Sequence, residues 1–459
     1  MLITTAIDYT NGLPHLGHAY EKVYADWWCR GLKQIGKPAF FLTGVDQHGQ
    51  KIQQSAQKLG IEPLEYVTNL SQEFKNRWAA LDINYDNWAE TTNPIHIKYV
   101  QNVLQNFYDR GLIYKGKKDG WFSVRQEQFI TEKDRNEDGT WAEIWGEVNF
   151  IEEENYYFKL DIDWLKASIS NFDISPLNYK NQLVHAIENY DGGDLCITRP
   201  KNRLSWGIET PFDSNFVTYV WFDALLNYCS FAEFKDVTHC IGKDILTPAH
   251  GIYWFCILKE LGFEFPRIRV HGWLTGPNGK KLSKSDGTGI DPLDELKYGS
   301  DVLRFHLLRC LNPSGDAVYT SDELIATNNE LANCYGNLLS RLITLVNKTT
   351  VKYSKFLLPD TFNDFQNLII DGDAQTLLSE GLRLAQYINS ELEKRAPWKK
   401  LKTNVDEANH DLSELCYLFF EVTKRLEAAI PNKAAIANAS LFVENEYIVA
   451  KLCPPLFPK

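Results

Sequence analysis

Two histidines stand three positions apart near the start of the chain, with a glycine between them. Residues 14–18 read Pro-His-Leu-Gly-His, so the pair is His15 and His18, with Gly17 between them. If a helix begins here, its first N–H groups and partial positive charge form an anion site. The imidazoles could then donate hydrogen bonds to phosphate oxygens, and Gly17 would let a flat ligand approach the backbone. The tetrad alone is also compatible with a simpler interpretation, in which one histidine caps the helix and the other is half-buried.

A second segment suited to phosphate chemistry lies far along the chain. Residues 275–287 read Thr-Gly-Pro-Asn-Gly-Lys-Lys-Leu-Ser-Lys-Ser-Asp-Gly. The Gly-Pro and Asn-Gly pairs predict a turn-rich loop. Lysine supplies positive charge and serine supplies hydrogen bonds, so the loop suits a polyphosphate. Taken alone, a solvated surface loop is the simpler interpretation.

The elements around these motifs indicate an α/β fold. Strand Leu2–Thr5, helix 18–34 and strand Pro38–Thr43 form a predicted β-α-β unit with parallel strands. The second strand leads into Gly44–Gly49, at the sheet edge where such folds bind ligands. The His-Leu-Gly-His tetrad is expected at the same edge.

The rest of the chain changes character twice. The stretch 115–213 is rich in aromatic and acidic residues and reads as an insertion of mixed structure. Strand and helix alternation then resumes, with strands predicted at Phe216–Phe222, His239–Ile241 and Ile268–Val270. From residue 321 onward apolar residues recur at helical spacing, which indicates an antiparallel helix bundle.

Composition narrows the class of protein. The 459 residues are 44% hydrophobic and 13% aromatic, enough for two to four packed domains. No apolar run reaches eighteen residues and no secretory signal is visible, so no membrane segment is expected. Nine cysteines lack any Cys-x-x-Cys spacing, which favours free thiols in the cytoplasm.

Net charge bears on nucleic-acid binding. A charge of −12 argues against a nonspecific nucleic-acid binder. It leaves room for a local basic patch, and residues 394–402 place basic side chains around Trp398, which could stack on a base. The simpler interpretation of that patch is a helix end followed by a new helix at Pro397.

The two motifs together resemble the signatures of class I aminoacyl-tRNA synthetases. Residues 15–18 resemble the His-Ile-Gly-His signature, and residues 281–285 resemble Lys-Met-Ser-Lys-Ser, with Leu282 in place of methionine. Within that class the chain is similar, over nearly its whole length, to the methionyl-tRNA synthetase family. Asp8 departs from the family pattern, and His250 stands one residue later than in many members.

The resemblance implies an α/β, doubly wound parallel-sheet nucleotide-binding domain that is split by a connective insertion and followed by an all-α helix-bundle anticodon-binding domain. The implied boundaries are 1–114 and 214–275 for the two halves of the nucleotide-binding domain, 115–213 for the insertion, 276–320 for the Lys-Leu-Ser-Lys-Ser loop and stem-contact region, and 321–459 for the helical domain.

The resemblance also implies site residues. The methionine-binding set is Ala6, Ile7, Tyr9, Asp46, Trp221, Ala224, Leu225, Tyr228, Ile245 and His250. The ATP-binding set is His15, Gly17, His18, Lys281, Ser283, Lys284 and Ser285. Arg199 is implied near the substrate carboxylate, with Arg203 as a competing assignment. The catalytic set is His15, His18, Lys281, Lys284 and Arg199, and the anticodon-binding set is Asn337, Arg341 and Trp398. Asp46 suits the substrate ammonium, because a buried cation needs a charge partner.

The implied reaction joins L-methionine to a methionine tRNA. ATP, accompanied by Mg²⁺, would convert the amino acid to methionyl-adenylate, and tRNA would then accept the methionyl group. Three alternatives stay open: another class I specificity, a small-molecule nucleotidyltransferase, and a tRNA-binding paralogue without catalysis.

Two further expectations concern zinc and oligomeric state. Most of the family carries zinc knuckles with paired cysteines in the insertion, but here Ser123 and Gln126 occupy the first pair and tryptophans the second. No structural zinc and no other protein-bound metal is therefore expected, and an aromatic cluster of Trp121, Phe122, Phe129, Trp141 and Trp145 is expected instead. Because the chain ends soon after the helical region, a monomer is expected.

Overall fold

The chain forms two compact units in the computed structural model, which describes residues 1–123, 128–130, 132–136, 138–282, 288–310, 314–359 and 361–457. Unit 1 comprises Met1–Leu13, Phe41–Lys75 and Tyr85–Val270. Unit 2 comprises Pro14–Phe40, Asn76–Asn84 and His271–Lys459. Each unit is therefore assembled from segments that are far apart in the sequence.

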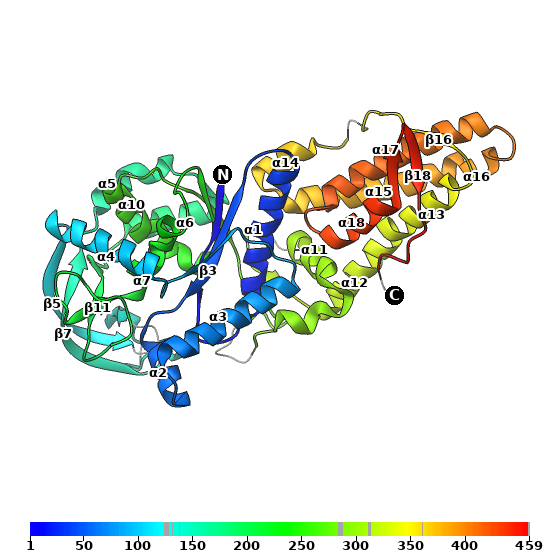
Figure 1. Cartoon of the computed structure of the whole chain (residues 1–459). Helices are drawn as coiled ribbons and strands as arrows, with labels where there is room; N and C mark the ends of the chain where they lie inside the picture. Colours follow the sequence, from blue (N-terminus) through cyan, green and yellow to red (C-terminus); the bar gives the residue numbers. More distant parts are fainter. Residues whose placement is uncertain are drawn as a thin grey trace. The chain divides into compact units, whose positions relative to one another are not determined.

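Unit 1 is built on a seven-stranded sheet (Figure 1). Its strand order is β2-β3-β1-β12-β13-β8, and β4 also pairs with β3. Strand β3 is labelled in Figure 1. The pairs β1–β12, β2–β3, β3–β4 and β13–β8 are parallel. The strands are β1 (Leu2–Thr5), β2 (Asp8–Tyr9), β3 (Phe40–Asp46), β4 (Asn87–Glu90), β8 (Ile174–Ser175), β12 (Val237–Gly242) and β13 (Arg267–His271). The α/β fold with a parallel sheet predicted from the sequence is thereby confirmed.

The central strands are buried along almost their whole length. Every residue of β1 and β12 is buried, and so is every residue of β3 after Phe40. Strands covered on both faces read as continuous apolar runs rather than as alternating patterns, which is why their positions were predictable. The register aligns Leu2 with Val237 and Thr5 with Cys240.

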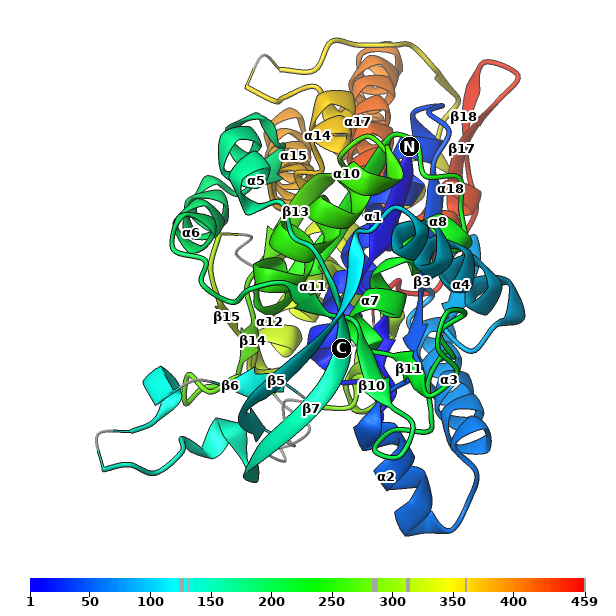
Figure 2. The same ribbon diagram turned by 90° about the vertical axis from the view of Figure 1, so that its left-hand side faces the viewer.

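Helices and a kinked helical segment complete unit 1 (Figure 2). They are α2 (Gln50–Leu59), α3 (Pro63–Ala80, which continues into unit 2), α4 (Pro94–Asp109), α5 (Ile162–Ser168), α6 (Leu177–Glu188), α7 (Val220–Leu225), α8 (Asn227–Ser230), α9 (Lys243–Ile245), the π-helix Leu246–Trp254 and α10 (Phe255–Leu261).

The stretch 115–213 combines a separate sheet with a return to the parallel sheet. Strands β5 (Ile113–Ser123), β6 (Gln128–Ile130), β7 (Val148–Phe158) and β9 (Leu195–Cys196) form an antiparallel sheet in the order β6-β5-β7-β9. Figure 2 shows β5 and β7 side by side as its long central pair. Strand β8 pairs with β13, so this part of the stretch extends the parallel sheet. A further two-stranded pair joins β10 (Thr198–Pro200) to β11 (Phe216–Thr218).

Unit 2 is mainly helical. Its helices are α1 (Leu16–Gln34), α11 (Ser300–Cys310), α12 (Ser321–Leu331), α13 (Asn337–Val346), α14 (Phe365–Asp371), α15 (Ala374–Arg395), α16 (Pro397–Lys400), α17 (Val405–Leu426) and α18 (Pro431–Ser440), with a short parallel pair of β14 (Leu274–Thr275) and β15 (Ala317–Val318). Helix α1 packs against α11, α14 and α15. The buried Arg304 lies 2.6 Å from Asp26 of α1 and donates to the carbonyl of Ala428 at 3.0 Å, which ties α11 to α1 and to the end of α17.

The expected all-α character of residues 321–459 is wrong in one respect. A three-stranded sheet in the order β16-β18-β17 lies within this region, formed by Val351–Lys352, Tyr447–Ala450 and Leu441–Glu444. Its hairpin turns at Asn445 and Glu446, both with positive φ, at 48° and 69°. Two central residues with positive φ match the twist of a tight β-hairpin. The sequence there lacks the Asn-Gly or Asp-Gly pair that usually signals such a turn.

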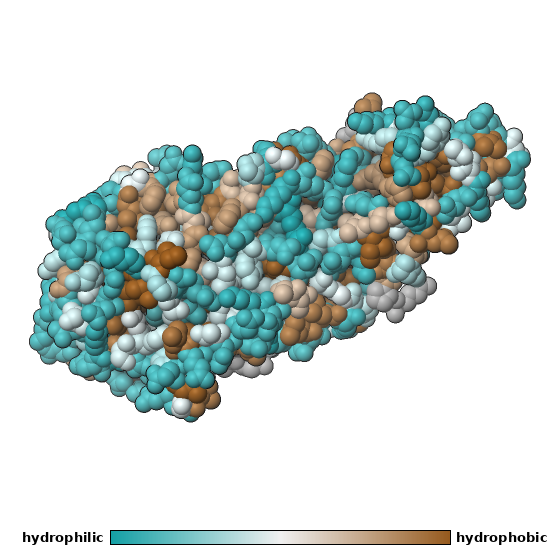
Figure 3. All heavy atoms as spheres, viewed as in Figure 1, coloured by the Kyte–Doolittle hydropathy of each residue, from teal (hydrophilic) through white to brown (hydrophobic). Residues whose placement is uncertain are grey.

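Within the described ranges, no helix is long and apolar enough to cross a membrane. On the face drawn in Figure 3, hydrophilic residues are interspersed with smaller hydrophobic groups.

Candidate functional site

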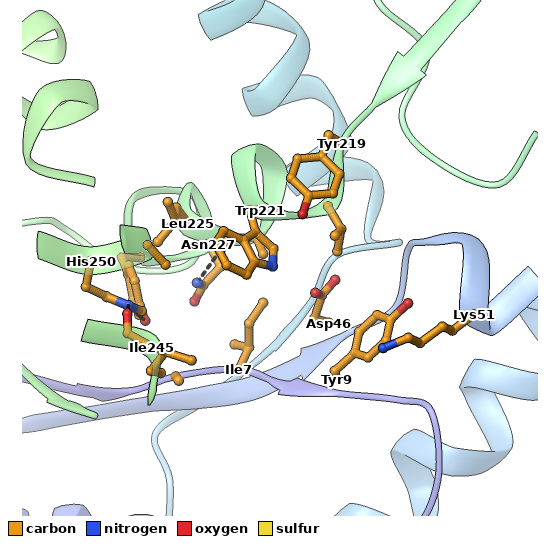
Figure 4. Close-up of a pocket in the computed structure, with 15 residues that line it drawn as sticks. Ile7, Tyr9, Asp46, Lys51, Tyr219, Trp221, Leu225, Asn227, Ile245 and His250 are labelled. Atoms are coloured by element: carbon orange, nitrogen blue, oxygen red, sulfur yellow. Dashed lines mark hydrogen bonds between the residues drawn. The ribbon is translucent and has the colours of Figure 1, made fainter. Parts of the chain in front are cut away.

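A pocket of about 260 Å³ lies in unit 1. It is lined by Ala6, Ile7, Tyr9, Asp46, Lys51, Tyr219, Val220, Trp221, Ala224, Leu225, Asn227, Tyr228, Ile245, Ala249 and His250 (Figure 4). All ten residues expected to bind methionine line this pocket. The structure thus brings together residues from positions 6 to 250 in one cavity.

The pocket has three walls, which are formed by four segments of the chain. The end of β1 and the following β2 supply Ala6, Ile7 and Tyr9, and the end of β3 supplies Asp46. Helices α7 and α8 supply a second wall, and the segment from α9 into the π-helix supplies the third. The pocket therefore lies at the carboxyl ends of the parallel strands, where such sheets bind ligands.

The two ends of the pocket differ in chemistry. Figure 4 shows Asp46, Tyr9 and Lys51 at one end and Ile245 and His250 at the other. Ile7, Trp221 and Leu225 lie between them and make the middle largely apolar. The cavity therefore suits a ligand with a charged head and an unbranched apolar chain that ends in a weakly polar group.

The Asp46 loop is fixed by hydrogen bonds from its neighbours. The amide and hydroxyl of Thr10 both donate to the Asp46 carbonyl, at 3.0 and 2.9 Å. The Trp206 indole donates to the Gln47 carbonyl at 2.6 Å. The Asp46 side chain is only 6% exposed, so its carboxylate is held in a nearly dry position at the pocket wall.

A buried pair joins this loop to the pocket helix α7. The His48 Nδ1 atom lies 2.9 Å from an Asp223 carboxylate oxygen, and both side chains are buried. The hydroxyl of Thr218 lies 3.3 Å from the same carboxylate oxygen. Because α7 also carries Trp221 and Ala224, the pair fixes the spacing between the charged end and the apolar wall.

His250 and Tyr228 form a defined hydrogen-bonded unit at the far end. The His250 Nδ1 atom lies 3.0 Å from the carbonyl oxygen of Ile245, which can only accept, so Nδ1 carries the ring proton. The Tyr228 hydroxyl therefore donates to Nε2, at 2.8 Å. With both of their hydrogens engaged in these bonds, Tyr228 and His250 present a weakly polar surface to the cavity that they line.

His250 stands in a π-helix rather than in a regular α-helix. Residues Leu246–Trp254 form i→i+5 turns, and Thr247 departs from helical geometry with φ −120° and ψ 126°. A π-helix takes up one more residue per turn than an α-helix. His250 lies within this segment and lines the pocket.

A second buried histidine supports Tyr228 from behind. The Trp254 indole donates to Nε2 of His239 at 2.9 Å, so Nδ1 carries the proton and lies 2.5 Å from the Thr4 hydroxyl. The ring centroid of His239 lies 4.2 Å from that of Tyr228. Complete burial, with a smaller contribution from His250, holds the pKa of His239 well below its usual range. The ring is therefore neutral near pH 7.

Five lining residues were missed by the sequence analysis: Lys51, Tyr219, Val220, Asn227 and Ala249. Val220, Asn227 and Ala249 each adjoin a predicted residue, and Tyr219 stands two positions before Trp221. Lys51 lies two residues after the Gly49 that ends the predicted ligand-binding loop, and a lysine so close to that loop was an available signal.

Arg199 does not line the pocket. Its guanidinium lies 4.0 Å from the Tyr219 ring centroid and donates to the carbonyl of Thr198 at 2.7 Å, and the side chain is only 4% exposed. The competing Arg203 pairs with Glu153 at 2.8 Å. Arg199 therefore contacts the pocket wall through Tyr219.

In unit 2, the His-Leu-Gly-His tetrad forms the N-terminus of α1. His15 is the N-cap residue, and its Nδ1 accepts from the Gly17 amide at 3.0 Å. His18 Nδ1 accepts from the His15 amide at 3.1 Å, which completes a reciprocal capping box. A Cβ atom on Gly17 would lie 2.8 Å from the His15 ring, so any other residue there would push that ring out of its present position. Because both Nδ1 atoms accept, both rings carry their proton on Nε2 when neutral.

The structure describes the lysine-containing loop 275–287 only as far as Leu282. The Lys281 ammonium lies 4.6 Å from the Trp273 ring centroid, and Leu282 is buried. Ser283, Lys284 and Ser285 lie outside the described residues.

The three residues expected to read the anticodon line one groove of unit 2. This groove of about 440 Å³ is lined by Asn333, Asn337, Ser340, Arg341, Thr344, Leu345, Asn389 and Trp398. The Arg341 guanidinium lies 6.0 Å from the Trp398 ring centroid and pairs with Glu393 at 2.5 Å.

The basic side chains near Trp398 are partly neutralised. Arg395 pairs with Glu414 at 2.7 Å, and Lys400 pairs with Asp411 at 2.7 Å. Helix α15 ends at Arg395 and α16 begins at Pro397, as the simpler interpretation of this patch predicted. The groove therefore offers an indole and amide groups more than free positive charge.

Comparison with known proteins defines the class first. A family model described as tRNA synthetases class I (M) matches residues 1–140 and 141–343. The methionine–tRNA ligase of Deinococcus radiodurans is 36% identical over 94% of this chain and 68% of its own length. That of Campylobacter jejuni is 32% identical over 100% of this chain and 79% of its own length. The structure of Mycobacterium tuberculosis methionyl-tRNA synthetase in complex with methionyl-adenylate superposes with a TM-score of 0.86 at 28% identity, covering 100% of this chain and 99% of that one.

The chain therefore belongs to the methionine–tRNA ligase family of the class I tRNA synthetases. It is a ligase that activates L-methionine with ATP and charges tRNA through a methionyl-adenylate. The resemblance identified from the two signature motifs is confirmed.

Proposed function

We propose that the pocket of unit 1 is the site at which this chain binds and activates L-methionine. The observation that carries the proposal is its two-ended chemistry, with Asp46 at one end and the Tyr228–His250 pair at the other. Asp46 suits the substrate ammonium, and the weakly polar pair suits a thioether in an apolar slot. The test is ATP–pyrophosphate exchange with each amino acid in turn, in which L-methionine should give the fastest exchange.

The chemistry that follows needs no nucleophilic side chain. The methionine carboxylate attacks the α-phosphorus of ATP, the bond to pyrophosphate breaks, and the terminal ribose hydroxyl of tRNA later takes the methionyl group. Both reactants are anionic, so the protein must orient them and stabilise the charge of the transition state. In the proposal His15, His18, Lys281 and Lys284 contact the phosphates, with Gly17, Ser283 and Ser285 in the same ATP-binding set, and Mg²⁺ enters with ATP.

The domain organisation implied by the resemblance is part of the same proposal. Residues 1–114 and 214–275 would form the nucleotide-binding domain around the insertion 115–213, and residues 321–459 would bind the anticodon. The cytoplasmic location and the monomeric state stay predictions, and light scattering would test the latter.

Trp398→Ala is expected to lower aminoacylation about 5- to 100-fold, because a base-stacking contact contributes about 1–3 kcal/mol. Methionine-dependent exchange should stay within about twofold of wild type, since the groove that contains Trp398 shares no lining residue with the proposed methionine pocket. Steady-state charging of a methionine tRNA measures the first quantity. Trp398→Phe, which keeps an aromatic face, is the matched control and should retain most of the activity. Equal loss of both activities would assign Trp398 to the packing of unit 2 instead.

The stretch around Ser123 contains contacts that could replace a metal. The Ser123 hydroxyl donates to the Trp145 carbonyl at 2.6 Å, where paired cysteines were expected in relatives. The Arg135 guanidinium lies 4.8 Å from the Trp121 ring and 4.7 Å from the Trp141 ring. The same arginine pairs with Glu132, which accepts from the Trp121 indole at 2.6 Å. Gln126 and the Phe129 side chain lie outside the described residues.

Purified protein is therefore expected to contain no stoichiometric zinc. Serine, glutamine and indole groups do not supply the thiolate or imidazole ligands of a tetrahedral site. Among the described residues, no three His, Cys, Asp or Glu side chains are grouped to hold a metal ion. Elemental analysis without prior chelation measures the content, and one zinc per chain would contradict the prediction.

A further inference from the structure

The pocket contains a second charged side chain that the expected site did not include. Asp46 and Lys51 are its only carboxylate and its only ammonium among the described lining residues. Figure 4 shows both at the same end, beside Tyr9. An amino acid carries an ammonium and a carboxylate on one carbon atom, so a site for it benefits from two opposite charges placed together.

Local backbone geometry brings Lys51 to this position. Gly49 has φ +120°, and a Cβ atom there would lie 2.4 Å from the Tyr9 hydroxyl oxygen. Glycine thus lets the chain pass closely over Tyr9 before α2 begins at Gln50. Lys51 is the second residue of that helix, and its ammonium lies 6.0 Å from the Tyr9 ring centroid.

The placement of Lys51 runs against the preference of its own helix. The first turn of α2 contains no acidic residue, and Gly49 provides no side-chain cap. A cation at this end is disfavoured by the helix dipole, whereas an anionic ligand is favoured there. Lys51 departs from the charge preference of its helix and does so at the wall of a pocket, which indicates that its position serves a function.

Arg199, which the family resemblance places near the substrate carboxylate, makes other contacts in this structure. Its guanidinium is engaged by the Thr198 carbonyl at 2.7 Å and by the Cys196 sulfur at 3.2 Å, beneath the Tyr219 ring. It is 4% exposed and does not line the cavity. Lys51 is half-buried and lines the cavity directly.

We propose that Lys51 binds the α-carboxylate of methionine and, once the carboxylate oxygen has displaced pyrophosphate, the α-phosphate of the adenylate. The inference rests on the proposed function of the pocket. Lys51 stays protonated throughout: the carbon-bound oxygen forms the new bond to phosphorus, pyrophosphate takes the electrons of the broken bond, and no proton moves. The lysine therefore acts by binding and orientation rather than by acid–base chemistry.

The test compares two ligands on the full chain by isothermal titration calorimetry. L-Methionine has the carboxylate, whereas L-methioninol keeps the ammonium and thioether but has an alcohol in its place. Lys51→Met should weaken L-methionine about 10- to 100-fold, as expected for the loss of a charge-assisted hydrogen bond. L-Methioninol should change by less than about twofold, because it makes no such contact. Lys51→Arg keeps the charge and should lose clearly less affinity for L-methionine than Lys51→Met.

Lys58→Met is the matched control, because Lys58 lies exposed in the last turn of the same helix. It should bind both ligands as wild type does. Equal weakening of both ligands by Lys51→Met, weakening of neither, or equal loss in Lys51→Arg would overturn the assignment.

A pocket-filling variant separates this outcome from failure of the proposed function. Ala224→Trp fills the apolar wall and should abolish binding of both ligands. If Ala224→Trp leaves both affinities unchanged, methionine binds elsewhere and the proposed function itself fails. If Ala224→Trp abolishes binding while Lys51→Met affects both ligands alike, only the role of Lys51 fails.

Discussion

Asp46→Asn is expected to lower methionine-dependent ATP–pyrophosphate exchange by about two to three orders of magnitude. The Asp46 side chain is 6% exposed, so a substrate ammonium beside it would be largely removed from water. Removing one partner of a buried ion pair costs about 3–5 kcal/mol, because the other charge is left without compensation. The effect should be measured as kcat/KM for methionine, at saturating ATP.

The amide of the variant retains the size and much of the hydrogen bonding of the carboxylate, so the loop should keep its structure. Asp109→Asn, at an exposed carboxylate at the end of α4, provides a control in the same unit and should leave kcat/KM unchanged. A loss below about tenfold for Asp46→Asn would show that another group compensates the ammonium.

The second large effect is expected at His18. His18 Nδ1 accepts from the His15 amide at 3.1 Å, so the ring can both cap α1 and donate from Nε2. Removing a donor that stabilises transition-state charge typically costs a factor of 100 to 1,000 in kcat, about 2.7–4 kcal/mol. His18→Ala should lose that factor in exchange at saturating methionine and ATP. It should also lose about 1 kcal/mol of stability, because the capping hydrogen bond is removed.

His18→Asn separates capping from catalysis. Its side-chain oxygen can still accept from the His15 amide, but it has no group at the position of Nε2. We expect near wild-type thermal unfolding together with the full loss of exchange. Normal exchange in His18→Asn would mean that the tetrad serves only to begin the helix.

The parts of the fold with strong local signals were predicted well. Strand β1 spans the predicted Leu2–Thr5, and α1 ends at Gln34, before Gly36 with its φ of +76°. The helix begins two residues earlier than predicted, at Leu16, because His15 acts as its cap. The predicted edge of the sheet is where the pocket lies.

Other parts of the fold depend on tertiary contacts that the local sequence pattern does not indicate. Phe216–Phe222 was predicted as a strand, but the strand ends at Thr218 and α7 begins at Val220. Short aromatic and β-branched runs do not distinguish a strand from a buried helix. The buried Asp223 of α7 contacts His48, which lies 175 positions away in the sequence. This contact depends on the helical conformation of the segment.

The candidate site was predicted mainly by resemblance. Trp221 and Ile245 read as ordinary core residues, and only the family pattern indicated a pocket. Lys51 was not predicted, although its closeness to the Gly44–Gly49 loop was a signal, because a lysine in the first turn of a helix is more often a solvated surface residue. The resemblance could not show the burial of Arg199 beneath Tyr219, since that depends on the pairing of β10 with β11.

The decisive experiment is ATP–pyrophosphate exchange across all amino acids, with wild-type protein and Ala224→Trp side by side. We expect L-methionine to drive the fastest exchange in the wild type and Ala224→Trp to abolish it, because the cavity between Asp46 and His250 is filled. Faster exchange with leucine, isoleucine or cysteine, or undiminished exchange with methionine in Ala224→Trp, would contradict it.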